Sequence, residues 1–179
     1  MNQKQDINTQ NVIADPSYRL CFDLELTNRC NALCTFCPRD KTPSQGFMSD
    51  AHFLKALDYA QAENIFISLT GQGESMIHPK FQEYVKEIKK RNLRCQITTN
   101  ASLLTESMAD FLLDVGIDKI NFSVSNLWED YDSVYNLPFD KTIKNIRYFI
   151  DNNNGRCVVQ VSIVKNKENA NKHREMRRF

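Results

Sequence analysis

Three cysteines lie close together near the start of the chain, where the segment Thr27–Pro38 reads TNRCNALCTFCP. Cys30, Cys34 and Cys37 form a C-x3-C-x2-C pattern, and cysteine thiolates are ligands that hold zinc ions and iron–sulfur clusters. A 4Fe-4S cubane has four irons, so three cysteines on one loop leave one iron without a protein ligand and free to bind a substrate group. The spacing therefore predicts a metal site with an open position, as in a catalytic zinc site.

Two other kinds of metal site are compatible with the same thiols. A structural zinc site would need a fourth ligand, for which His52 and His78 are available, although such sites usually combine two C-x2-C pairs. A ferredoxin-type cluster would need a fourth cysteine. Cys21, Cys95 and Cys157 each begin a predicted strand, and about six residues at ~3.3 Å each would separate Cys21 from the loop by ~20 Å. We expect these cysteines to be buried, inert thiols at the opposite edge of the sheet.

The aromatic residue Phe36 stands directly before the third cysteine of the pattern. C-x3-C-x2-C with an aromatic residue at this position resembles the radical S-adenosylmethionine (SAM) superfamily, and the resemblance covers residues 18–166. It implies that Cys30, Cys34 and Cys37 hold a 4Fe-4S cluster, and that the amino and carboxylate groups of SAM chelate its fourth iron. It also implies that Phe36 lies near the adenine.

A glycine turn after the second predicted strand resembles another motif of this family. The segment Gly71–Ser75 reads GQGES and is similar to the family's Gly-Gly-Glu motif. The resemblance assigns Gly73 to a close approach between backbone and ligand, and Glu74 to a charge-assisted hydrogen bond from the ammonium group of SAM. Ser75 stands where many relatives have proline. Without the resemblance, such a turn would indicate an ordinary loop.

The third and fourth predicted strands also end in polar residues. Thr98–Ala101 is similar to the family's Thr-Asn-Gly ending, and the resemblance gives Asn100 a place in the SAM pocket. Asn121–Asn126 is similar to the family's Ser-x-Asp ending, in which Ser123 matches the serine and Ser125 occupies the acidic position. The alternative for each of these residues is ordinary solvation or turn chemistry.

A scaffold must bring these strand ends together. Apolar or alternating runs predict strands at Leu20–Leu26, Ile65–Thr70, Cys95–Thr99, Lys119–Ser125 and Cys157–Val164. Capping residues and apolar spacing predict helices between them, at Asp50–Ala62, Lys80–Lys90, Glu106–Val115 and Asp140–Asp151. The order βαβαβαβαβ predicts parallel strands joined by right-handed crossovers, either in an open doubly wound sheet or in part of a β/α barrel.

The alternation of residues within the strands favours the barrel. One face is polar and carries Asp23, Glu25, Thr27, Ser68, Thr70, Gln96, Thr98, Asn100, Asn121, Ser123, Ser125, Gln160 and Ser162. The other face is apolar and carries Phe22, Leu24, Leu26, Ile65, Ile67, Leu69, Ile120, Phe122, Val124, Val159, Val161 and Ile163. We infer an α/β fold of the partial (β/α)6 radical SAM barrel type, with a polar lumen and truncation after about five βα units. The alternative is an open sheet with its polar face exposed to solvent.

The composition fits a single globular domain. Of 179 residues, 41% are hydrophobic, and 23 Lys and Arg nearly balance 22 Asp and Glu, which indicates neither a nucleic-acid partner nor an anionic membrane. The opening residues have no signal-peptide pattern and no apolar run approaches a membrane span, so we expect a cytoplasmic protein with reduced thiols. We divide it into a polar extension at 1–17 and an incomplete core at 18–179, the latter indicating a fragment, a truncated product or half of a split protein.

The resemblance implies an enzyme that reductively cleaves SAM to a 5'-deoxyadenosyl radical, which abstracts hydrogen from a polar substrate in the lumen. The most similar members act on peptides, cofactor precursors or natural products, and often carry a C-terminal SPASM/twitch cluster domain. A flavodoxin- or ferredoxin-like protein would donate the electron. Two rivals remain open: a non-catalytic iron–sulfur or zinc module, and a plain nucleotide-binding α/β domain. Residues 167–179 are expected to begin a further helix, with a basic tail for an acidic partner as the alternative.

Overall fold

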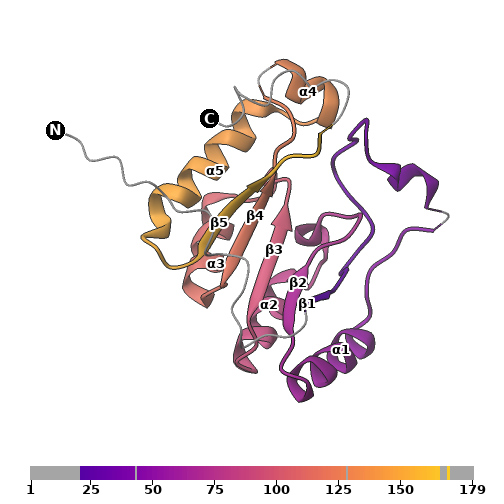
Figure 1. The fold of residues 1–179 in the computed structure, drawn as a ribbon, viewed down its shortest axis with the longest axis vertical. Coiled ribbons are helices and arrows are strands. Elements are labelled where there is room, and N and C mark those ends of the chain that lie inside the picture. The colour runs from indigo at the N-terminus through magenta and orange to yellow at the C-terminus, as the bar shows by residue number, and fades with distance from the viewer. Residues whose placement is uncertain (1–20, 43, 128, 166–168, 170–179) are drawn as a thin grey trace.

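The computed structural model describes residues 21–42, 44–127, 129–165 and 169 (Figure 1). Its strands are β1 (Cys21–Asp23), β2 (Phe66–Leu69), β3 (Cys95–Thr99), β4 (Lys119–Ser123) and β5 (Val158–Ser162). Its α-helices are α1 (Asp50–Ala62), α2 (Phe81–Lys90), α3 (Glu106–Val115), α4 (Glu129–Tyr135) and α5 (Phe139–Asn153). Two short 3-10 helices, η2 (Pro38–Lys41) and η3 (Ser75–Ile77), lie in the connections after β1 and β2.

The strands form one parallel sheet in the order β1-β2-β3-β4-β5. Each crossover therefore moves one position in the same direction, and right-handed crossovers of this kind put the connecting helices on one face of the sheet. The carboxyl ends of all five strands meet at a single edge (Figure 1). The alternating α/β architecture with parallel strands is confirmed, and it leaves the other face of the sheet without covering helices in the described part of the chain.

Local capping explains why α1 and α3 have the predicted bounds. The Ser49 side chain accepts a hydrogen bond from the backbone N–H of His52 at the start of α1, and Thr105 accepts one from Met108 at the start of α3. α3 ends at Gly116, whose φ of 75° is in the left-handed region that glycine adopts without strain. These side chains satisfy N–H groups that the first helical turn leaves unpaired.

The hydrophobic core lies between the helices and the apolar face of the sheet. Ile67, Ile97 and Phe122 supply the strand side of this core and are fully buried. The prediction that Val161 is buried is wrong, because 54% of its surface is exposed. β5 pairs only with β4, and no helix after β5 lies in the described residues to cover Val161; the predicted helix at 167–179 falls outside them, apart from Asn169.

Three further features differ from the sequence predictions. Helix α4 was not predicted, and β1 is shorter than the predicted strand, whose first residue lies outside the described residues. Cys21 is exposed, so the prediction of a buried thiol is wrong there, because β1 lies at the edge of the sheet. Cys95 and Cys157 are buried as predicted, and burial raises the pKa of Cys95 to about 12 and that of Cys157 to about 11.

The helices of the described residues are all too short or too polar to cross a lipid bilayer.

Candidate cofactor site

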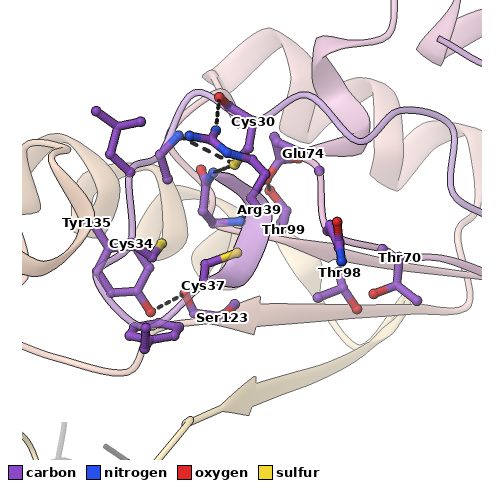
Figure 2. A pocket seen from close by; sticks show the side chains of 17 residues that line it. Cys30, Cys34, Cys37, Arg39, Thr70, Glu74, Thr98, Thr99, Ser123 and Tyr135 are labelled. Carbon is purple, nitrogen blue, oxygen red and sulfur yellow. Dashed lines mark hydrogen bonds between the residues drawn. The ribbon is translucent and has the colours of Figure 1, made fainter. Parts of the chain in front are cut away.

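A cavity of about 150 Å³ opens at the edge where the strands end (Figure 2). It is bounded by the loop that carries Cys30, Cys34 and Cys37, called the cysteine loop below, by the turn after β2, and by the ends of β3 and β4. Eight of the residues predicted for the site line it together: Cys30, Cys34, Phe36, Cys37, Gly73, Glu74, Asn100 and Ser123. The sequence motifs therefore converge on one place, although they are spread over most of the chain.

Ser125 is the one predicted site residue that does not line this cavity. Its side chain is fully buried, and its Oγ accepts a hydrogen bond from the backbone N–H of Val164 at 2.9 Å. Its own backbone N–H donates to the hydroxyl of Tyr135 at 2.7 Å. β4 ends at Ser123, so the chain has left the sheet before Ser125 and no longer presents that side chain on the polar face.

The cysteine loop is held in place by helix α4. The backbone N–H of Leu33 donates to the carbonyl of Tyr135 at 2.9 Å, and that of Thr35 donates to the carbonyl of Val134 at 3.0 Å. These carbonyls belong to the last turn of α4, where backbone acceptors have no partner within the helix. The ring of Tyr135 also packs edge-on against Phe36, with 5.8 Å between the ring centroids.

Arg39 is buried, and its side chain reaches back from the residues after the third cysteine to the backbone at the first. Nη1 of Arg39 donates to the carbonyl of Cys30 at 2.6 Å, and Arg39 lines the cavity (Figure 2). Its positive charge lies close enough to favour the thiolate forms of Cys30 and Cys34. Neither Arg39 nor Tyr135 was predicted as a site residue, although the apolar spacing of Tyr131, Val134 and Tyr135 is a helical signal that could have revealed α4.

The three thiols are half-buried and face the same cavity (Figure 2). Burial, followed by the charges of Cys30 and Cys37, raises the pKa of Cys34 to about 12, and burial also raises the pKa of Cys30. A cation that binds the sulfurs would relieve this repulsion between thiolates. No group of three His, Cys, Asp or Glu side chains in the described residues is arranged to hold a single metal ion, whereas each cysteine of a 4Fe-4S cluster binds a different iron.

The metal ligands that this site offers are the sulfur atoms of its three cysteines. His52 lies at the exposed start of α1, and His78 contacts the carbonyl of Met48 at 3.1 Å; neither lines the cavity. Among the described residues, the histidine-completed zinc site considered from the sequence therefore has no histidine donor at this cavity. Three cysteines with no further thiol in the cavity wall fit a 4Fe-4S cluster with one open iron.

The carboxylate of Glu74, in the turn after β2, is hydrogen-bonded to residues at the end of β3. Its Oε2 accepts hydrogen bonds from the hydroxyl of Thr99 at 3.0 Å and the backbone N–H of Asn100 at 2.9 Å, while Oε1 accepts one from the N–H of Met76 at 3.2 Å. Burial raises the pKa of Glu74, although these bonds favour the carboxylate. A carboxylate accepts about four hydrogen bonds, so Glu74 keeps capacity for one donor in the cavity.

Gly73 brings the turn after β2 against the cysteine loop. A Cβ at this position would collide with the backbone oxygen of Thr27 and would come within 2.5 Å of that of Arg29. The N–H of Glu74 donates to the same Arg29 oxygen at 2.8 Å. The glycine is therefore required by a close approach between two backbone segments, rather than by its own dihedral angles.

A parallel α/β sheet with its site at the carboxyl ends of the strands is the arrangement of β/α enzymes, and here that site carries three cysteines. The family model described as the Radical SAM superfamily matches residues 24–179, and the chain belongs to this superfamily. The two cofactors inferred from the sequence, a 4Fe-4S cluster and SAM, are those that the superfamily uses.

Two curated relatives illustrate the similarity. A tungsten-containing aldehyde ferredoxin oxidoreductase cofactor-modifying protein of Pyrococcus furiosus is 32% identical over 165 residues, which cover 87% of this chain and 46% of the relative. A probable GTP 3',8-cyclase of Methanothermobacter thermautotrophicus is 36% identical over 107 residues, or 58% of this chain and 34% of the relative. The chain thus spans less than half the length of these relatives.

Solved structures share the fold. Streptococcus suis SuiB superposes with a TM-score of 0.71 at 19% identity, covering 90% of this chain and 37% of SuiB. Native anSMEcpe with bound AdoMet superposes with a TM-score of 0.70 at 19% identity, covering 86% of this chain and 46% of anSMEcpe. The partial radical SAM barrel is thereby confirmed as the fold class.

Proposed function

We propose that this chain is the catalytic core of a radical SAM enzyme that cleaves SAM reductively and uses the resulting radical to abstract hydrogen from a polar substrate. The observation that carries the proposal is the convergence of the three-cysteine loop, the glycine–glutamate turn and the end of β3 on one cavity. We further propose residues 18–179 as the extent of this core, with 1–17 as an extension; the family match over 24–179 supports it.

In this proposal Cys30, Cys34 and Cys37 hold the cluster. When bound and reduced, the cluster supplies one electron to SAM, whose S–C5' bond breaks into methionine and a 5'-deoxyadenosyl radical that takes a hydrogen atom from the substrate. The protein's own contribution is to position SAM and exclude water. Half-burial of the thiols and the α4 cover over the loop support that role.

The remaining cavity residues would bind SAM. The spare acceptor capacity of Glu74 suits the ammonium group of the methionine moiety, and a charge-assisted bond there would replace part of its hydration. Gly73 lets the turn lie against the cysteine loop, while Phe36 offers an aromatic ring to the adenine and Ser123 a hydroxyl. We leave Ser125 out of this set because it is fully buried outside the cavity wall.

The electron donor would be a flavodoxin- or ferredoxin-like protein, and the substrate would lie on the polar face of the sheet. Thr70 and Thr98 extend the cavity wall toward that face with hydroxyl groups, which supports a polar rather than a hydrocarbon substrate (Figure 2). Peptides, cofactor precursors and natural products are the candidate classes. The relative from P. furiosus, which is called a cofactor-modifying protein, belongs to one of these classes by its name.

The test is anaerobic reconstitution with iron and sulfide, followed by dithionite reduction in the presence of SAM and chromatography for 5'-deoxyadenosine. A variant with Cys30→Ser, Cys34→Ser and Cys37→Ser should lose both the cluster absorbance and the product. Cys21→Ser is the matched control, because Cys21 is exposed and lies outside the cavity. A cluster without SAM cleavage would favour a non-catalytic module, and tight zinc binding without iron would refute the cluster assignment.

A further inference from the structure

A closed ring of three polar side chains joins the end of β3 to the cysteine loop. Nδ2 of Asn31 donates to Oγ of Ser102 at 2.7 Å, and that hydroxyl donates to Oδ1 of Asn100 at 2.6 Å. Nδ2 of Asn100 then donates back to Oδ1 of Asn31 at 3.1 Å. Each of the three side chains both gives and receives a hydrogen bond, so none can rotate without breaking the ring.

The ring fixes which way the amide of Asn100 points. Its Oδ1 accepts hydrogen bonds from both the backbone N–H and the hydroxyl of Ser102, so the opposite end of the amide must be the NH₂ group. That group has two hydrogens. One is directed to Asn31, and the other faces Sγ of Cys30, with Nδ2 and Sγ 3.8 Å apart.

Helix α5 anchors this arrangement through Asn145, which does not line the cavity. Nδ2 of Asn145 donates to the carbonyl of Ala101 at 2.9 Å and lies 3.4 Å from that of Ser102. Ala101 has a φ of 61°, a left-handed conformation that turns the chain sharply after Asn100. Asn100, Ser102 and Asn145 are all at least nine-tenths buried, so water does not compete strongly for these bonds.

From this geometry we infer that Asn100 is a positioning residue for the cluster, which donates an N–H···S hydrogen bond to the Cys30 sulfur and thereby raises the reduction potential. The inference rests on the proposed cluster assignment. Reduction adds negative charge to the cluster and its sulfur ligands, and a fixed donor stabilises the more negative state. The backbone N–H of Ala32 already donates to the same sulfur at 3.4 Å, so Asn100 supplies a second donor.

The test is a redox titration of the reconstituted protein, in which the electron paramagnetic resonance signal of the reduced cluster measures the reduced fraction at each potential. Asn100→Leu removes the donor at similar volume, and Ser102→Ala removes a bond that orients it. At a fixed solution potential, we expect the ratio of reduced to oxidised cluster to fall about threefold in Asn100→Leu, or about 30 mV for a one-electron couple, and less in Ser102→Ala.

Asn121→Leu is the matched control. It removes an amide from the polar face of the neighbouring strand, where Nδ2 bonds to Ser162 and Thr98 rather than to sulfur, and it should leave the potential unchanged. An Asn100→Leu protein that holds its cluster at the wild-type potential would overturn the inference. If that variant holds no cluster, Ser102→Ala decides: a lowered potential supports the inference and an unchanged one overturns it. Failure of the wild type to assemble any cluster would instead refute the proposed function itself, and the inference with it.

Discussion

Replacement of Gly73 by alanine should open the contact between the turn after β2 and the cysteine loop. The new Cβ would come within 2.5 Å of the Arg29 oxygen and closer still to that of Thr27, and both obstacles are backbone atoms that cannot rotate away. The Thr27 oxygen, the nearer of the two to the new Cβ, would have to retreat by about 1.4 Å to reach ordinary van der Waals contact at 3.4 Å.

The cost can be worked out from the contacts that move. Overpacking of this kind costs about 1–3 kcal/mol. The displaced Arg29 oxygen would also lose its 2.8 Å hydrogen bond from the N–H of Glu74, which adds about 1 kcal/mol. The free energy of unfolding should therefore fall by about 2–4 kcal/mol in Gly73→Ala, and iron content after reconstitution should fall with it because Cys30 directly follows Arg29.

Two other glycines provide graded controls in a urea denaturation series. A Cβ on Gly46 would meet nothing within 4 Å, so Gly46→Ala should be neutral. A Cβ on Gly71 would meet the exposed side chain of Glu25, which can rotate away at the cost of its hydrogen bond from the N–H of Gln72. The effect of Gly71→Ala should lie between the other two. If Gly73→Ala and Gly46→Ala proved equally stable and bound equal iron, the reasoning from backbone contact would be refuted.

Three further predictions concern groups that are buried or half-buried. Tyr135→Phe removes the acceptor for the buried N–H of Ser125, so urea denaturation should show a loss of about 1–3 kcal/mol, and a loss below 0.5 would contradict this. Asn145→Leu leaves the carbonyl of Ala101 without its donor, and the same assay should show a loss of about 1–3 kcal/mol; an unchanged midpoint would count against the anchoring role of α5. Because burial raises the pKa of Cys34 to about 12, the thiolate is scarce at neutral pH, and its alkylation by iodoacetamide in the metal-free protein should increase about tenfold per pH unit without a plateau below about pH 11. A plateau near pH 9, read by peptide mass spectrometry, would contradict this assignment.

Local signals predicted the elements whose ends are set by their own residues. α1 and α3 have the predicted bounds because Ser49, Thr105 and Gly116 act within a single helical turn. The parallel order of the strands follows in the same way from the alternation of strand and helix patterns. Predictions were less accurate for β1, where the sheet pairs only Cys21–Asp23 although the apolar pattern continues for several residues.

Long-range contacts account for what the sequence did not reveal about the site. The period-two pattern put Ser123 and Ser125 on one face, but β4 ends between them and Tyr135 and Val164 hold Ser125 in the interior. The role of Asn31 depends on a partner from the distant β3–α3 turn, which no local pattern reveals. Pairing with such distant residues is a property of the fold rather than of the motif.

The attachment of the cysteine loop to α4 has a consequence for how the protein matures. Leu33 and Tyr135 are far apart in the sequence, so the loop can form its hydrogen bonds to α4 only after the chain through Tyr135 has been synthesised. Until then, the three cysteines lie on a segment with no cover from α4. We therefore expect iron and sulfide to be delivered to a folded apoprotein rather than to the nascent chain. In that case the cluster is inserted only after the last turn of α4 has bound the cysteine loop.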